Sequence, residues 1–186
     1  MNIKKLKLYM AQVENPAALV IQLALYKLIA RLFGTTHDIY EWIVPIRYGG
    51  FKSKYVFQVM KQLSPEDKEF YAIIRNPKYK SLIDIGSSLG TVTDYFLRQS
   101  SDRKAVCFEP KISFVKFSRS HLPESVKIHS VALSDVRGFA TLYSKGKYDQ
   151  KSSLVDKRPN KTTVIVNTLD NYNYKPDLIK IDIRFI

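Results

Sequence analysis

A short run of small, acidic and glycine residues offers the clearest chemistry in the chain. Residues 84–90 read DIGSSLG, which places Gly86 and Gly90 four residues apart. Glycine allows a backbone to turn sharply and to approach a ligand closely. The first N–H groups of a helix that follows such a turn attract carboxylate or phosphate groups. The run predicts an anion-binding turn between a strand and a helix; a turn that needs glycine for its geometry alone is the alternative.

An acidic residue that ends the next apolar segment can act on the same ligand. Glu109 lies 19 residues after Gly90, and Pro110 follows it, which favours the end of a strand over a core position. In open α/β sheets, ligands bind beyond the carboxyl ends of the strands, and an acid that ends the second strand accepts ribose hydroxyls. Glu109 and the glycine turn together predict a nucleoside site; an ordinary surface acid is the alternative.

Ser88 bears on which nucleoside ligand fits the turn. The dinucleotide pattern GxGxxG has a glycine at this position, and that glycine admits the pyrophosphate. A serine side chain would crowd a pyrophosphate, but S-adenosylmethionine carries an amino acid carboxylate and a sulfonium instead. The turn therefore favours S-adenosylmethionine over NAD as the ligand.

These residues meet only if a parallel sheet brings the ends of their strands to one edge. Short apolar segments predict strands at residues 81–86, 105–110, 126–133 and 176–182. Helices are predicted between the first three strands, at residues 91–100 and 111–122. Such alternation is typical of βαβ units in an α/β fold. The β-rich segments 138–143 and 162–168 flank a lysine-rich stretch and predict a hairpin-like insertion.

The first part of the chain, residues 1–76, predicts a helical region ahead of a domain formed by residues 77–186. Pro16 and Gly34 suit the start and the stop of a helix over residues 16–33. A second helix is predicted over residues 53–62, after a break at two glycines.

A third helix is predicted to start at Ser64-Pro65, where serine suits the N-cap and proline the first helical position. Phe70, Ile73 and Ile74 would then share one face. Asn76-Pro77 ends this helix.

The apolar segment at residues 16–33 raises the question of membrane contact. Gln22, Lys27 and Arg31 interrupt it at spacings that place a polar stripe along one helical face. A membrane span would need about 20 apolar residues with few charges. The segment predicts a helix packed on its own domain or on a partner, with a helix lying on a membrane surface as the alternative.

The overall composition sets broader limits. The chain carries 30 Lys and Arg against 17 Asp and Glu, a net charge of +13, divided as +7 over residues 1–80 and +6 over residues 81–186. A spread excess is typical of a solvated surface, so no specific nucleic acid partner is expected, with a polyanion site as the alternative. The single cysteine, Cys107, excludes an internal disulfide and fits a cytoplasmic protein. With three scattered histidines, it leaves no metal-ligand cluster.

Five segments occur in an order and spacing that point to one protein family. They are LIDIGSSLG (82–90), CFEP (107–110), VALSD (131–135), NTLDNY (167–172) and PDLIKID (176–182). In these segments the chain resembles the FkbM family of S-adenosylmethionine-dependent methyltransferases. The family usually has Ala-Asn at the position of Ser87-Ser88, and both pairs are small. The resemblance implies a Rossmann-like class I methyltransferase sheet. It also implies O-methylation of a sugar or secondary-metabolite hydroxyl, with a small molecule or glycan as acceptor.

The resemblance also implies roles for individual residues by position. The residues implied to bind the methionine half of the donor are Asp84, Gly86, Ser87 and Gly90. Glu109 would hold the ribose. Asp135 would lie near the adenine, with a turn acid before Arg137-Gly138 as the alternative. Asp182 would lie beside the transferring methyl group or the acceptor, and it is the only residue we name as a catalytic base. Lys180 and Asp182 are two residues apart, so on a strand they share a face.

The end of the chain departs from the family pattern. After KID the family continues with Val-Glu-Gly and a helix, whereas this chain reads Asp182-Ile183-Arg184-Phe185-Ile186. The resemblance therefore predicts a sheet that is incomplete at its C-terminal side, in a truncated product with little or no activity. Two hypotheses follow: a methyltransferase, completed or not by another chain, and a non-catalytic remnant or donor-binding module.

Overall fold

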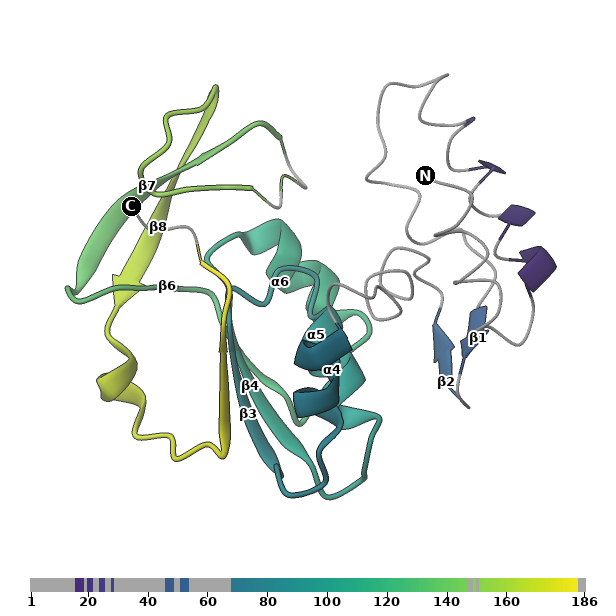
Figure 1. Ribbon diagram of the computed structural model, residues 1–186. Coiled ribbons are helices and arrows are strands. Elements are labelled where there is room, and N and C mark those ends of the chain that lie inside the picture. Colours follow the sequence, from purple (N-terminus) through teal and green to yellow (C-terminus); the bar gives the residue numbers. More distant parts are fainter. Residues whose placement is uncertain are drawn as a thin grey trace. The chain divides into compact units, whose positions relative to one another are not determined.

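The computed structural model describes residues 16–18, 20, 21, 24, 25, 28, 46–48, 51–53, 68–146, 149 and 151–183. The chain divides into two compact units, residues 1–74 and residues 75–186. Figure 1 labels many of the helices and strands, and the two units are described separately below.

The first unit contains helical residues and a short hairpin. All described residues between positions 16 and 28 are helical. Strands β1 (Ile46–Tyr48) and β2 (Phe51–Ser53) pair antiparallel, with Tyr48 opposite Phe51. The prediction of a wholly helical region was therefore wrong at this hairpin, whose strands flank the glycine break. The remainder of the two predicted helices lies outside the described residues. Within the described part, no helix has both the length and the apolar character to cross a bilayer.

Helix α4 (Lys68–Arg75) corresponds to the third predicted helix, whose predicted start at Ser64-Pro65 lies outside the described residues. Its acidic Glu69 in the first turn and basic Arg75 in the last turn complement the helix dipole. Tyr71 and Ile74 are buried, three residues apart on one face. The predicted apolar face was wrong at Ile73, which is 48% exposed, because the buried stripe runs through Tyr71 instead.

The second unit is built on a four-stranded parallel sheet. Its strands are β3 (Ser81–Ile85), β4 (Lys104–Phe108), β5 (Lys127–His129) and β9 (Leu178–Ile181). Their order in space is β5-β4-β3-β9, and every pair is parallel. The unit is therefore an α/β fold with a sheet compatible with a Rossmann-like arrangement. Strands β4 and β5 follow on one side of β3, whereas β9 lies on its other side. The order of the strands therefore reverses beside β3.

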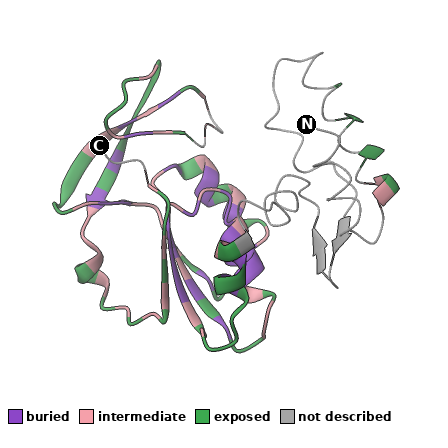
Figure 2. Ribbon diagram, viewed as in Figure 1, coloured by how far each residue is buried: buried purple, intermediate pink, exposed green. Residues whose placement is uncertain are grey.

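Helices α5 (Thr91–Leu97) and α6 (Ile112–Arg119) lie together on one side of this sheet (Figure 1). Figure 2 shows buried residues on both helices and on the strands beside them. The buried side chains of the two helices include Val92, Phe96, Phe114 and Val115. Four of the five residues of β3 are buried. A strand that is buried on both faces is typical of the centre of a parallel sheet.

The other side of the sheet carries an apolar cluster of its own. Ile83, Ile85, Phe108 and Leu133 are buried there. Leu169, Tyr172 and Tyr174 pack against this cluster, and the first two belong to the 3-10 helix η3 (Leu169–Tyr172). Side chains of β3 thus alternate between the two faces, as the period of a strand requires.

A second, three-stranded sheet is formed by β6 (Ala132–Leu133), β7 (Gly138–Ser144) and β8 (Asn160–Asn167), in the order β6-β8-β7. The antiparallel pairing of β7 with β8 confirms the predicted hairpin. The single strand predicted over residues 126–133 was wrong, because the chain leaves β4 after His129 and pairs β6 with β8. Ala132 then packs in the cluster of the second sheet, while Leu133 packs in that of the first.

Asp177 fixes the start of β9 against the start of β3. Its carboxylate oxygen Oδ2 accepts hydrogen bonds from the Lys80 N–H, the Ser81 N–H and the Ser81 hydroxyl at 2.8–3.0 Å. The Asp177 N–H in turn donates to Ser81 Oγ at 2.9 Å. This exchange sets the register of two strands that are almost a hundred residues apart in the sequence, and thereby positions the far end of β9.

Candidate functional site

The predicted glycine turn joins the carboxyl end of β3 to α5. Gly86 and Gly90 both have φ +71°, and Ser88 between them has φ +50°, so alternate residues adopt the left-handed conformation. The N–H groups of Gly86 and Ser87 both donate to the Phe108 carbonyl, at 2.9 and 3.2 Å. Backbone hydrogen bonds therefore attach the start of the turn to the end of β4.

Packing within the protein requires a glycine at position 86, and the left-handed backbone favours glycine at both positions. A Cβ atom at Gly86 would overlap the backbone carbonyl oxygen of Asp182, where β9 passes the turn. A Cβ atom at Gly90 would lie 2.9 Å from Leu122 Cδ1 and 3.1 Å from Ser118 Oγ, beside α6. The alternative that the turn needs glycine for its geometry alone is therefore sufficient to explain both residues. Their presence by itself does not identify a ligand site.

Glu109 lies at the end of β4 and reaches the turn directly. Its carboxylate Oε2 accepts the Ser88 N–H at 2.9 Å, and its Oε1 accepts the Lys111 N–H at 2.8 Å. The side chain is only 6% exposed. The pKa of Glu109 is raised to about 7, mainly by burial and to a smaller extent by the charge of Asp84. The two hydrogen bonds act in the opposite direction and lower the pKa.

This pKa makes stability depend on pH in a specific direction. The folded chain holds the Glu109 proton up to about pH 7, whereas the unfolded chain releases it near 4.5. The free energy of unfolding should therefore decrease as the pH rises through this window, by up to roughly 3 kcal/mol, and stay level above it. Urea denaturation of the wild type and of Glu109→Gln at a series of pH values measures this, because the glutamine cannot titrate.

The difference between the two proteins is the informative quantity. His129 has its pKa lowered, mainly by burial, so its contribution runs in the opposite direction over part of the same range. The contribution of His129 is the same in the wild type and in Glu109→Gln, so it cancels when their free energies of unfolding are subtracted. A difference that does not change between pH 4.5 and 7 would contradict the raised pKa of Glu109.

Asp84 lies beneath the turn, on the side of the sheet that faces the helices. It has no exposed surface, and its Oδ2 accepts the Thr93 hydroxyl at 2.8 Å. Its Oδ1 forms an ion pair with Lys180 Nζ at 2.9 Å. Thr93 also contacts the Cys107 thiol at 3.1 Å, and burial raises the pKa of that thiol to about 12. Through Thr93 and Lys180, Asp84 supports the turn from the face of the sheet that carries the helices. Cys107 is a core residue, as predicted.

Lys180 was not assigned a role from the sequence, yet it contacts the turn. Its Nζ donates to the Gly86 carbonyl at 2.9 Å, and its side chain is 10% exposed. The signal in the sequence is a lysine between two isoleucines in the strand segment LIKID, where burial is expected. What the sequence lacks is the register that sets Lys180 opposite Asp84.

Asp182, the named catalytic base, follows β9 at the same edge of the sheet. Its N–H donates to the Ile85 carbonyl at 3.0 Å, which extends the pairing of β9 with β3. Its carboxylate Oδ2 lies 3.9 Å from Lys180 Nζ, which confirms that the two side chains share a face. The side chain of Asp182 is 68% exposed.

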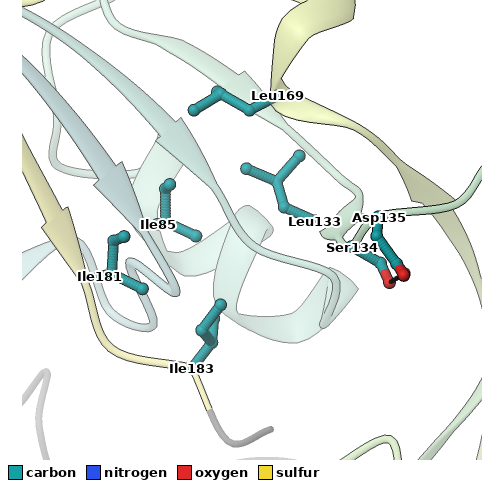
Figure 3. A pocket seen from close by; sticks show the side chains of 7 residues that line it. All are labelled: Ile85, Leu133, Ser134, Asp135, Leu169, Ile181 and Ile183. Atoms are coloured by element: carbon teal, nitrogen blue, oxygen red, sulfur yellow. Dashed lines mark hydrogen bonds between the residues drawn. The ribbon is translucent and has the colours of Figure 1, made fainter.

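The opposite face of the same strand ends borders a hollow of about 500 Å³ (Figure 3). Its apolar lining consists of Ile85, Leu133, Leu169, Ile181 and Ile183. Ser134 and Asp135 lie together at one side of it, and the Ser134 hydroxyl donates to Asp135 Oδ1 at 2.9 Å. Asp182 is not among the lining residues, although its two neighbours in the chain are.

The structure thus brings most of the predicted site residues to the carboxyl end of β3, but on two faces. Glu109, Asp84 and Asp182 lie on the side of Lys180, linked through the turn. Asp135 lies apart from them, in the apolar hollow. Among residues 68–146, 149 and 151–183 and the shorter described stretches, no group of three His, Cys, Asp or Glu side chains is placed to bind a metal ion.

Comparison with known proteins adds no assignment. No family model, no curated protein and no solved structure matches the chain.

Proposed function

We propose that the second unit is a class I methyltransferase fold that binds S-adenosylmethionine and transfers its methyl group to a hydroxyl of a sugar or a secondary metabolite. The observation that supports this most is the contact between Glu109 and the glycine turn. It lies at the carboxyl ends of β3 and β4, beside the point where the strand order reverses. Ligands of open α/β sheets bind at such switch points.

The residues around the turn fit the polar groups of this donor. Each oxygen of Glu109 accepts one N–H from the protein, which leaves acceptor capacity for the two hydroxyls of a ribose. The hydroxyl of Ser88 is buried and has no hydrogen-bond partner among the described residues. In the hollow, the carboxylate of Asp135 is suited to the amine of an adenine, and the isoleucines are suited to its ring.

The bound donor would supply a methyl group on a positively charged sulfur. On transfer, the acceptor oxygen would gain the methyl carbon, and the carbon–sulfur bond would break to leave neutral S-adenosylhomocysteine. The hydroxyl proton would then have to leave, and the carboxylate of Asp182, which lies beside the turn, would accept it as the general base. Most of the rate enhancement in this proposal comes from positioning the two reactants.

Donor binding without methyl transfer is the second candidate function. The exposure of Asp182 supports it, because a largely exposed carboxylate close to Lys180 is not held in one orientation by burial. Incubating the protein with the donor and a panel of sugars, and measuring the release of S-adenosylhomocysteine, distinguishes the two functions.

Calorimetry with S-adenosylhomocysteine at about pH 8 tests donor binding directly. We expect the wild type to bind one molecule per chain and Glu109→Ala to bind at least about tenfold more weakly, since hydrogen bonds to a charged group are lost. Glu124→Ala, which changes an exposed acid, is the matched control and should bind as the wild type does. Absence of binding by folded wild-type protein would overturn the proposal.

A further inference from the structure

Lys180 is a buried cation that the proposed reaction does not use. It lies in β9 in register with Asp84 of β3, and its side chain is 10% exposed. A lysine in this position must give up most of its hydration, so its contacts inside the protein decide its role.

The strongest hydrogen bond of Lys180 goes to the turn. Its Nζ lies 2.9 Å from the Gly86 carbonyl oxygen and 3.5 Å from that of Ile85. The contact with Asp84 Oδ1 is equally short, but it is an ion pair that lies off the direction of a hydrogen bond. The ammonium group is therefore aimed at the start of the turn and balanced by the carboxylate below it.

Side chains hold the turn from two sides. On the β4 side, Glu109 accepts the Ser88 N–H. On the β9 side, Lys180 donates to the Gly86 carbonyl. Between these contacts lies Ser87, whose N–H is tied to Phe108. Three successive residues of the turn are thus fixed by neighbouring strands, and among the described residues Lys180 provides the side-chain hydrogen bond from β9 to the turn.

We propose that Lys180 is a positioning residue of the donor site, which sets the orientation of the glycine turn through the Gly86 carbonyl. This inference rests on the proposed function for its ligand, but the ordering of the turn does not depend on it. A misplaced turn would shift the Ser88 N–H away from Glu109 and change the surface offered to the ribose and the methionine group. Because Lys180 also neutralises Asp84, the two effects must be separated by experiment.

Two charge-neutral double variants separate these effects. Asp84→Asn/Lys180→Met removes the ion pair and the donor to Gly86. Asp84→Asn/Lys180→Gln removes the ion pair but keeps an N–H donor, on a side chain one bond shorter than that of lysine. Both variants and the wild type are compared in calorimetry with S-adenosylhomocysteine and in amide hydrogen exchange of the segment 86–90.

We expect the methionine variant to bind at least about tenfold more weakly than the glutamine variant and to exchange faster in segment 86–90. Both variants carry Asp84→Asn, so the effect of that change is the same in the two. Wild-type values for the methionine variant in both measurements would overturn the proposal. Loss of folding in either variant would assign Lys180 a structural role and would overturn it as well. If the wild type does not bind the ligand, the proposed function fails, while hydrogen exchange still tests the role of Lys180.

Discussion

Gly86→Ala is expected to lower the free energy of unfolding by about 2–5 kcal/mol. A non-glycine residue in the left-handed conformation costs about 1–2 kcal/mol, and overpacking adds about 1–3 kcal/mol. Both apply here, because Gly86 has φ +71° and its new methyl group would overlap the carbonyl oxygen of Asp182. That oxygen belongs to the backbone directly after β9, so the overlap can be relieved only if this segment moves away from the turn.

Thermal and urea denaturation of the full chain measure this effect. Gly146→Ala is the matched control, since a Cβ atom there meets no other atom within 4 Å. We expect the control to change stability by less than about 1 kcal/mol. Equal stability of the two variants would contradict the close passage of β9 against the turn.

The second large effect is expected for Lys180→Met. This change leaves the carboxylate of Asp84 without its counter-charge in a position with no exposed surface. Removing one partner of a buried ion pair costs about 3–5 kcal/mol, mostly because the remaining charge is uncompensated. Thr93 still donates one hydrogen bond to Asp84, but a neutral hydroxyl does not replace a positive charge.

Adding Asp84→Asn to Lys180→Met is expected to restore most of the lost stability. A neutral amide can accept the Thr93 hydroxyl and carries no charge to be buried. Urea denaturation of the single and double variants near pH 7 gives the difference. If the double variant is no more stable than the single one, the cost does not arise from the charge of Asp84.

Local patterns in the sequence determined the central elements of the second unit. The strands β3 and β4, and the helices α5 and α6 beside them, follow from apolar runs and from helical periodicity, which need no distant partner. The turn at Gly86 and Gly90 was also predictable, because glycine is the residue that adopts positive φ at little cost. The helices end a few residues earlier than predicted, since periodicity alone does not fix a boundary.

Only the tertiary structure shows why the chain has glycine at these two positions. The sequence allowed a ligand or the chain itself to approach them closely. In the structure, the approach is made by Asp182 at Gly86 and by Leu122 at Gly90. The support for a ligand site moved accordingly to Glu109, whose buried carboxylate reaches the turn from the neighbouring strand.

Strand pairing decided what local patterns left open. Residues 126–133 were predicted as one strand, yet β5 pairs with β4 and β6 pairs with β8. Ile128 of β5 packs against the cluster of Cys107, whereas Ala132 of β6 packs in the cluster of the second sheet. The role of Lys180 depends in the same way on the register that sets it opposite Asp84, 96 residues earlier in the chain. The sequence by itself determined the central strands and helices of the second unit and where the turn lies. Tertiary structure alone decided which strands are neighbours, and therefore which charges and carbonyl groups meet at that turn.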